Sequence, residues 1–434
     1  MKPVAQKIEI AVIFLVCLIY SGTFWPLDVY FGVGNLALEG FSIFSRTEVV
    51  LLTIFLVVTG FLRRGEIMRV LWLGWPVLLL VGIAFLSAFW AEAPLLVLRR
   101  SAVMMVSTLF AFYLVVRCEL GELVALLVRV FTVVAIASFA VMLISPSLGI
   151  DHAVGQPNAW RGAFTTKNEL AWAAALGVLL SAYGLWRGYG SRLVAGVTLV
   201  ASVILIVLAN SMTIPFMLLS AAYAGTLAVS LRRRTGLGAF AAIVLLVLGG
   251  VALVAMLANE TQVLAALNRS PSLTGRVELW RQALIYIEQR PWLGYGFGGF
   301  WRTDSVEANH IWAVIGWDPP HAHNGWLELG LSLGLLGIVG AACLWFATLW
   351  RIFKLLLRGA VDHVPFALAF LGACFVENLT ESALFRASDM GWLLFVYFFL
   401  YLKREAARDR IAAAAERLRR RAALRAPLLA GAAS

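Results

Sequence analysis

The sequence predicts an all-α polytopic membrane protein with about twelve transmembrane helices. Of its 434 residues, 62% are hydrophobic and only 14% are charged. Apolar runs of about 20 residues, the length needed to cross a bilayer, recur along the whole chain. These two features argue against a soluble domain, a disordered chain or a nucleic-acid-binding protein. We therefore expect the main solvent of the chain to be lipid.

Twelve apolar windows are long enough, or nearly so, to span a bilayer. The first lacks the small-residue cleavage pattern of a signal peptide, and we expect it to be retained. A long polar loop, 258–324, separates the ninth window from the tenth, and residues 1–434 are expected to form one integral membrane domain. The windows are Ile8–Trp25, Glu48–Leu62, Val70–Trp90, Arg100–Val116, Leu120–Ile144, Leu170–Trp186, Leu193–Ala209, Thr213–Val229, Leu237–Leu257, Gly325–Trp350, Val364–Val376 and Met390–Leu402.

Basic residues predict the orientation of these windows. If the N-terminus is inside, every inner connection carries lysine or arginine, as the positive-inside rule requires. This distribution also accounts for a net charge of +11. Both termini are then cytoplasmic, and the loops 145–168 and 258–324 are periplasmic. The basic tail, 403–434, is expected to form a cytoplasmic helix against anionic lipid headgroups.

The long loop is predicted to be partly helical. Residues Arg276–Gln289 form a helical pattern that ends before Pro291. Its predicted apolar face consists of Val277, Trp280, Leu284 and Ile287, and should lie at the outer membrane boundary. The glycine-rich stretch 294–299 has no strand–helix unit around it, so a dinucleotide loop is rejected. We expect a flexible turn that lets the backbone approach a sugar or a lipid.

Two histidines, His321 and His323, lie where this loop meets the tenth window. Imidazole is the side chain most easily poised to take a proton near neutral pH. His323 is therefore the candidate base, although it could instead cap the following helix or bond within the loop. The pair could also be metal ligands, but no cysteine or well-spaced acid completes a set, so we expect no metal. The four cysteines, all within apolar runs, are predicted to act as small hydrophobes.

Several arginines and lysines fall on the predicted outer face, against the topological bias. Each could pair with a lipid phosphate or a nearby acid. As a set they favour an anionic ligand, because the planar guanidinium fork matches phosphate oxygens. In the segment before the sixth window, Thr165 or Thr166 is expected to cap a helix with Glu169 in its first turn. Near the last outer turn, Glu377, Glu381, Arg386 and Asp389 could pair with one another.

Four short motifs give these residues a family resemblance. Arg161-Gly-x-Phe-x-x-Lys-Asn168, Thr274-Gly-Arg276-x-x-x-Trp280, Pro291-x-x-Gly294-x-Gly296 and His323-Asn324-x-x-Leu327-Glu-x-Gly330 occur in this order. Together they resemble the O-antigen ligase and polymerase superfamily of bacterial polysaccharide assembly. The motifs cover about residues 145–345, and the span count extends the resemblance to the whole chain.

The resemblance implies glycosyl transfer on the periplasmic face of the inner membrane, without metal, nucleotide or other cofactor. The donor would be a glycan on undecaprenyl diphosphate, and in the ligase the acceptor is a sugar hydroxyl of lipid A–core. His323 would be the base, with Arg276 and Arg161 stabilising the departing diphosphate. Direct attack would invert the anomeric centre, since no acid pair indicates a covalent intermediate. Substrate-binding candidates are Lys167, Asn168, Arg281, His321, Asn324 and Arg386.

Other functions remain open at this point. Within the superfamily, the alternatives are an O-antigen polymerase and an O-linked protein oligosaccharyltransferase. Outside it, a cell-wall glycan polymerase and a secondary transporter share the approximate number of spans. The transporter is disfavoured because the longest loop does not separate two halves and no matching broken spans carry buried acids.

Overall fold

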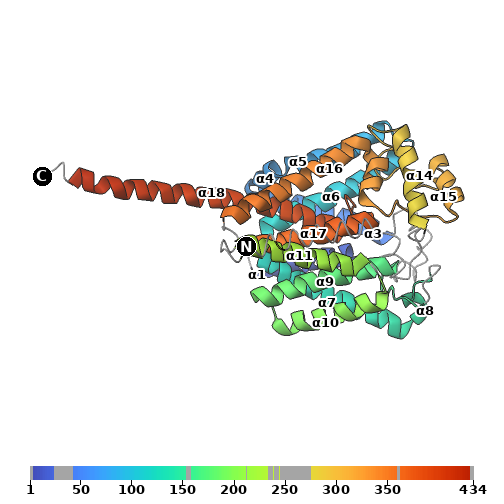
Figure 1. Ribbon diagram of the computed structural model, residues 1–434, viewed down its shortest axis with the longest axis horizontal. Coiled ribbons are helices and arrows are strands. Elements are labelled where there is room, and N and C mark those ends of the chain that lie inside the picture. Colours follow the sequence, from blue (N-terminus) through green and yellow to red (C-terminus); the bar gives the residue numbers. More distant parts are fainter. Residues whose placement is uncertain are drawn as a thin grey trace.

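The computed structural model describes residues 3–23, 43–152, 158–211, 213–232, 238, 244, 275–358 and 362–430. Within these residues every regular element is a helix, which confirms the all-α class, and the one β-bridge is an isolated contact between Ile150 and Trp160. The long helices run alongside one another as a bundle (Figure 1). Helices α14 and α15 lie at one end. The N-terminus lies toward the other end, from which α18 projects.

The helix boundaries agree closely with most of the predicted windows. The seventh, eighth, tenth and eleventh windows begin within one residue of α10, α11, α16 and α17, and the fifth coincides with α7. The elements are α1 (Pro3–Tyr20), α3 (Ile43–Leu62), α4 (Arg64–Leu73), α5 (Trp75–Leu86), η2 (Ser87–Phe89), α6 (Pro94–Arg117), α7 (Leu120–Ile144), α8 (Pro146–Gly149), α9 (Lys167–Arg187), α10 (Arg192–Ala209), α11 (Thr213–Arg232), α14 (Arg276–Gln289), α15 (Val306–Ile315), α16 (Gly325–Arg358), α17 (Val364–Thr380) and α18 (Met390–Ala430).

The number of membrane spans is smaller than twelve in the part of the chain that the structure describes. Six helices, α6, α7, α9, α10, α11 and α16, are long and apolar enough to cross a bilayer. A bent pair, α4 with the segment Trp75–Phe89, would make a seventh. The ninth window, Leu237–Leu257, lies almost wholly outside the described residues. Twelve spans therefore remain a prediction.

The third window, Val70–Trp90, does not form one straight helix. It is divided between α4 and α5, and the two parts are bent by 80°. Gly74 occupies the break, where an added Cβ would lie 2.1 Å from the ring of Phe112. Pro76 follows in the first turn of α5, the helix position that a proline tolerates best. Close packing at Gly74 and the proline after it together explain the bend.

The glycine-rich stretch 294–299 packs against a kink in α16. Gly334 has φ 61° and ψ −155°, a backbone conformation that a residue with a Cβ rarely adopts. The kink frees backbone groups of α16, so that Tyr295 N donates to Leu331 O at 2.8 Å and Leu335 N donates to Pro291 O at 2.7 Å. The stretch is anchored to α16, because Gly296 N also donates to Ser332 O at 3.0 Å. An approach of its backbone to a sugar or a lipid remains a prediction.

Helix α14 has the predicted bounds but buries a different face. Leu279 and Ala283 are fully buried, whereas Val277 and Leu284 of the predicted apolar face are 46% and 48% exposed. The buried face anchors α14 beside the histidine loop, because it belongs to one compact apolar cluster. That cluster consists of Leu279, Ala283, Tyr295, Phe300, Trp301, Ala308, Ile311, Ala322 and Leu331.

Candidate functional site

Three chain segments distant in sequence meet on the carboxylate of Glu381, which lies in the turn between α17 and α18. Its Oε1 accepts hydrogen bonds from Arg276 Nη2 at 2.7 Å and from Asn168 Nδ2 at 2.8 Å. Its Oε2 lies 2.9 Å from His323 Nδ1. The side chains of Arg276, His323 and Glu381 are 18%, 16% and 15% exposed, so the cluster is enclosed but reachable. Three predicted site residues are thus brought together by one acid.

The start of α14 sets the position of Arg276. Gly275 precedes the helix in the left-handed conformation, with φ 85°, which turns the chain into α14. The guanidinium then divides its donors between two acceptors: Nη1 donates to Thr380 O at 2.6 Å and Nη2 to Glu381. A planar fork suits this arrangement, because both bonds leave one rigid group. Arg276 therefore links α14 to the end of α17.

The backbone around His323 is held on both sides. Asn324 caps α16, since its Oδ1 accepts from Trp326 N at 3.0 Å and from Leu327 N at 3.2 Å. On the other side, Ala322 N donates to the Glu328 carboxylate at 2.8 Å. His323 itself has φ 48°, a left-handed conformation that is uncommon for a residue other than glycine. Such backbone strain persists only where the surroundings fix it, as they do here.

The charge on Glu381 determines the tautomer of His323. Burial would raise the pKa of Glu381, but the hydrogen bond and charge of His323 and the charge of Arg276 lower it to about 2. An ionised carboxylate only accepts hydrogen bonds, so the proton between the two groups is on Nδ1. Arg276 Nη2, 3.4 Å from the same Nδ1, is also a donor and forms no hydrogen bond with it. In the neutral form of this tautomer Nε2 is the nitrogen that accepts a proton, and no described residue donates a hydrogen bond to it.

His321 has a different environment. Its Nδ1 accepts from the backbone N of His323 at 3.2 Å, and the two rings are 4.2 Å apart. Burial and the adjacent His323 lower the pKa of His321 to about 3. A group with so low a pKa is a weak base at neutral pH. The geometry therefore favours His323 as the base and gives His321 a supporting role.

Glu381 is an acid close to both histidines, and the sequence-based expectation of no metal rested on the absence of such an acid. Potential ligand atoms of His321, His323 and Glu381 lie within 4.8 Å of one another. The statement that no acid completes a set with the histidines is therefore wrong. The donor set nevertheless suits a divalent cation poorly, because His321 Nδ1 is already an acceptor for His323 N and Glu381 is paired with the cationic Arg276.

The segment before α9 contributes Asn168 and a helix cap. Thr166 Oγ1 accepts from Glu169 N, which confirms the predicted capped start. The Arg161 guanidinium donates to Leu148 O at 2.9 Å and to Thr165 O at 3.4 Å, which ties it to the loop that leads into α9. Lys167 Nζ lies 3.5 Å from Asn210 O. Direct contact of Arg161 or Lys167 with a substrate remains a prediction.

Two further predicted residues lie apart from Glu381. Arg281 is 72% exposed on α14 and pairs with Glu278 at 3.5 Å. Arg386, 47% exposed, forms its ion pair with Glu169 at 3.2 Å. It also interacts electrostatically with Asp389 and Glu381, as predicted for the residues of this turn. Asn324 is engaged as the α16 cap. Substrate contacts of all three remain predictions, and Arg386 is the one joined to the site through α9.

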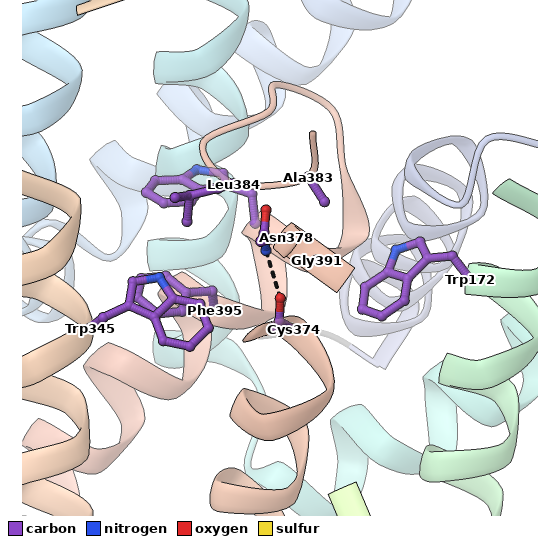
Figure 2. Close-up of a pocket in the computed structure, with 9 residues that line it drawn as sticks. Trp172, Trp345, Cys374, Asn378, Ala383, Leu384, Gly391 and Phe395 are labelled. Atoms are coloured by element: carbon purple, nitrogen blue, oxygen red, sulfur yellow. Dashed lines mark hydrogen bonds between the residues drawn. The ribbon is translucent and has the colours of Figure 1, made fainter. Parts of the chain in front are cut away.

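A small cavity lies beside the turn that carries Glu381 (Figure 2). Trp172 and Trp345 approach it from α9 and α16, and Asn378 projects from α17 with its Nδ2 bonded to Cys374 O at 2.7 Å. Its volume of about 10 Å³ is enough for roughly one water molecule. No glycan or lipid can occupy a cavity of this size, so it is not a candidate substrate site.

These features define a helical membrane protein with a partly exposed histidine–carboxylate–arginine site, and comparison with known proteins gives its family. Residues 197–342, which include Arg276 and His323, match the family model described as O-Antigen ligase. The chain is also 28% identical over 336 residues to the exopolysaccharide production protein ExoQ of Rhizobium meliloti (strain 1021), covering 73% of each chain. The chain is therefore similar to members of the O-antigen ligase and polymerase superfamily, the same superfamily that its motifs resemble.

This similarity, together with the long apolar helices, indicates a multi-pass membrane protein and a glycosyltransferase-like enzyme of polysaccharide biosynthesis. Lipid-linked polysaccharides and membrane lipids are the general class of substrate. The family match ends at residue 342 and therefore does not include Glu381, the acid at the centre of the site.

Proposed function

We propose that the protein transfers a glycan from undecaprenyl diphosphate to a sugar hydroxyl of lipid A–core, as an O-antigen ligase. The observation that carries this proposal is the junction of His323, Glu381 and Arg276. It combines a group that accepts a proton, an acid that orients it and a cation beside it. Such a set matches transfer from an activated glycosyl diphosphate, which needs no nucleotide.

In the proposed reaction the acceptor hydroxyl lies against His323 Nε2. The imidazole takes the hydroxyl proton as the oxygen attacks the anomeric carbon, and the bond to the diphosphate breaks. General base catalysis of this kind accelerates a reaction by about 10²–10⁴-fold. Glu381 stabilises the imidazolium that forms, since its carboxylate already binds Nδ1. Attack opposite the leaving group inverts the anomeric centre.

The departing diphosphate needs positive charge. Arg276 lies beside His323 and supplies positive charge, although part of its guanidinium is bound to Thr380 O and Glu381. We propose that Arg161 and Arg386, on the neighbouring α9 side, complete the anion site. On this account the site lies in the periplasm, at the outer face of the inner membrane, with both termini in the cytoplasm.

The relative named for exopolysaccharide production favours a different acceptor, namely another lipid-linked glycan. If the acceptor is another lipid-linked glycan, the same residues would extend a polysaccharide chain and the protein would be a polymerase. The chemistry at His323 is the same in both cases, because each acceptor offers a sugar hydroxyl.

One experiment distinguishes the two. Purified protein is mixed with undecaprenyl-diphosphate glycan and lipid A–core, without nucleotide, and the products are separated by gel mobility. Glycan on lipid A–core supports the ligase. Longer donor chains with unchanged lipid A–core support the polymerase, and an absence of both products contradicts the glycosyltransferase proposal.

A further inference from the structure

A groove far from the Glu381 cluster lies between α1 and α7. It encloses about 320 Å³ and is lined by Lys7, Ile10, Ala11, Phe14, Leu126 and Arg129. Four of these six side chains are apolar, and the two others are cations. We call it the α1–α7 groove.

The two cations have no acidic partner within the described part of the chain. Lys7 and Arg129 are both exposed. The nearest acid on α1, Glu9, is buried and already committed, because it accepts from Arg117 Nε at 2.8 Å and from Arg63 Nη2 at 3.2 Å. It also accepts from the Tyr113 hydroxyl. The charges that line the groove are therefore not neutralised by this cluster.

The depth of Arg129 makes its charge costly. Helix α7 is a candidate membrane span that begins at Leu120. Arg129 lies nine residues further on, about 13 Å along the axis at a rise of about 1.5 Å per residue. A cation facing lipid at that depth is unfavourable unless it reaches an anion, and a long side chain does so by extending toward the headgroup level. Lys7, near the start of α1, lies on the side toward which Arg129 would extend.

We propose that the α1–α7 groove binds an anionic phospholipid. The phosphate sits between Lys7 and Arg129, and an acyl chain lies along Ile10, Phe14 and Leu126. Basic pockets between membrane helices are a known way of binding acidic headgroups. Free inorganic phosphate would leave the apolar floor unused, and a lipid without net charge would leave the two cations uncompensated. An anionic phospholipid would both neutralise the two cations and cover the apolar side chains of the groove.

The test is lipid binding to the purified full-length protein in detergent, followed by native mass spectrometry. The protein is titrated with phosphatidylglycerol, phosphatidylcholine or inorganic phosphate. We expect saturable binding of phosphatidylglycerol that exceeds binding of phosphatidylcholine, and no retained phosphate. Arg129→Gln and Lys7→Gln should each weaken phosphatidylglycerol binding about fivefold, the contribution of one basic residue near an anionic surface.

Two further variants make the result specific to the groove. Arg64→Gln removes an exposed cation of α4 outside the groove and should leave binding unchanged. Ala11→Phe fills the apolar floor while keeping both charges, and should also weaken phosphatidylglycerol binding. Equal affinity for the two lipids, or undiminished binding by Arg129→Gln and Ala11→Phe, would overturn the proposal. Retention of inorganic phosphate alone would show an anion site without a lipid.

Discussion

His323 Nδ1 lies 2.9 Å from Glu381 Oε2, although 58 residues separate the two in the chain. This contact places the proton on Nδ1 and leaves Nε2 as the acceptor, so the carboxylate prepares the imidazole to act as a base. Arg276 and Asn168 donate to the other oxygen of the same acid. The orientation of His323 therefore depends on contacts from α9, α14 and the α17–α18 turn.

Replacing Glu381 by glutamine should lower kcat by about 10²–10⁴-fold with little change in KM. The amide keeps the size of the side chain but offers a donor or a neutral acceptor to His323, so the required tautomer is no longer imposed. The measurement is initial rate against donor concentration in the transfer assay. Glu278→Gln on α14 is the matched control, since the described contacts of this acid are with Arg281 and Gln282 of its own helix and not with the Glu381 cluster. Equal rates in wild type and Glu381→Gln would refute the orienting role.

Replacing Arg276 by lysine should lower kcat/KM about ten- to a hundredfold. A lysine keeps the charge but cannot bind Thr380 O and Glu381 from one rigid plane, and it leaves a partly buried acceptor unpaired. Arg64→Lys, at an exposed arginine of α4 outside the Glu381 cluster, is the control and is expected to keep its activity. If the two variants behave alike, the fork geometry at Arg276 is irrelevant to transfer.

The stability of the protein should depend on Glu381 in a defined acidic range. Its pKa is lowered from about 4.5 to about 2 in the folded protein, so its contribution is fully present above about 4.5 and is lost as the pH falls toward 2. The difference in thermal unfolding midpoint between wild type and Glu381→Gln should therefore narrow as the pH falls from about 4.5 toward 2. A difference that does not narrow in this range would contradict the assignment.

Transfer should survive removal of divalent metal. His321, His323 and Glu381 could in principle approach one ion, but their atoms are engaged with each other and with Arg276. Dialysis against EDTA, followed by the transfer assay in metal-free buffer, should give an unchanged rate. Loss of activity that is restored by a divalent cation would instead make the three residues metal ligands.

Much of the fold follows from the sequence, because apolar length and helix boundaries are local properties. Helices α7 and α14 have the predicted bounds, and α16 begins at the predicted Gly325. The bend at Gly74 and the kink at Gly334 could not be predicted, since each depends on a neighbour distant in sequence: the ring of Phe112 and the backbone of Trp292. A glycine in an apolar run does not by itself reveal such a neighbour.

The site was predictable in part for the same reason. His323, Arg276 and Asn168 belong to recognisable motifs, and the structure brings all three to one point. For Glu381 the sequence predicts only that it could pair with the other charged residues of the turn after α17. No local pattern distinguishes an acid that orients a histidine from one that pairs with Arg386. Its position at the end of α17, opposite the His323 loop, is a property of the folded bundle.

The most direct test of the account compares His323→Ala with His321→Ala in the transfer assay, using undecaprenyl-diphosphate glycan, lipid A–core and no nucleotide. Both proteins are first shown to be folded by their elution profile and thermal unfolding. We predict that His323→Ala lowers the transfer rate by about 10²–10⁴-fold. His321→Ala should keep measurable activity, because a side chain with a pKa of about 3 is too weak a base to be the one that takes the proton. Normal transfer by folded His323→Ala would contradict the account.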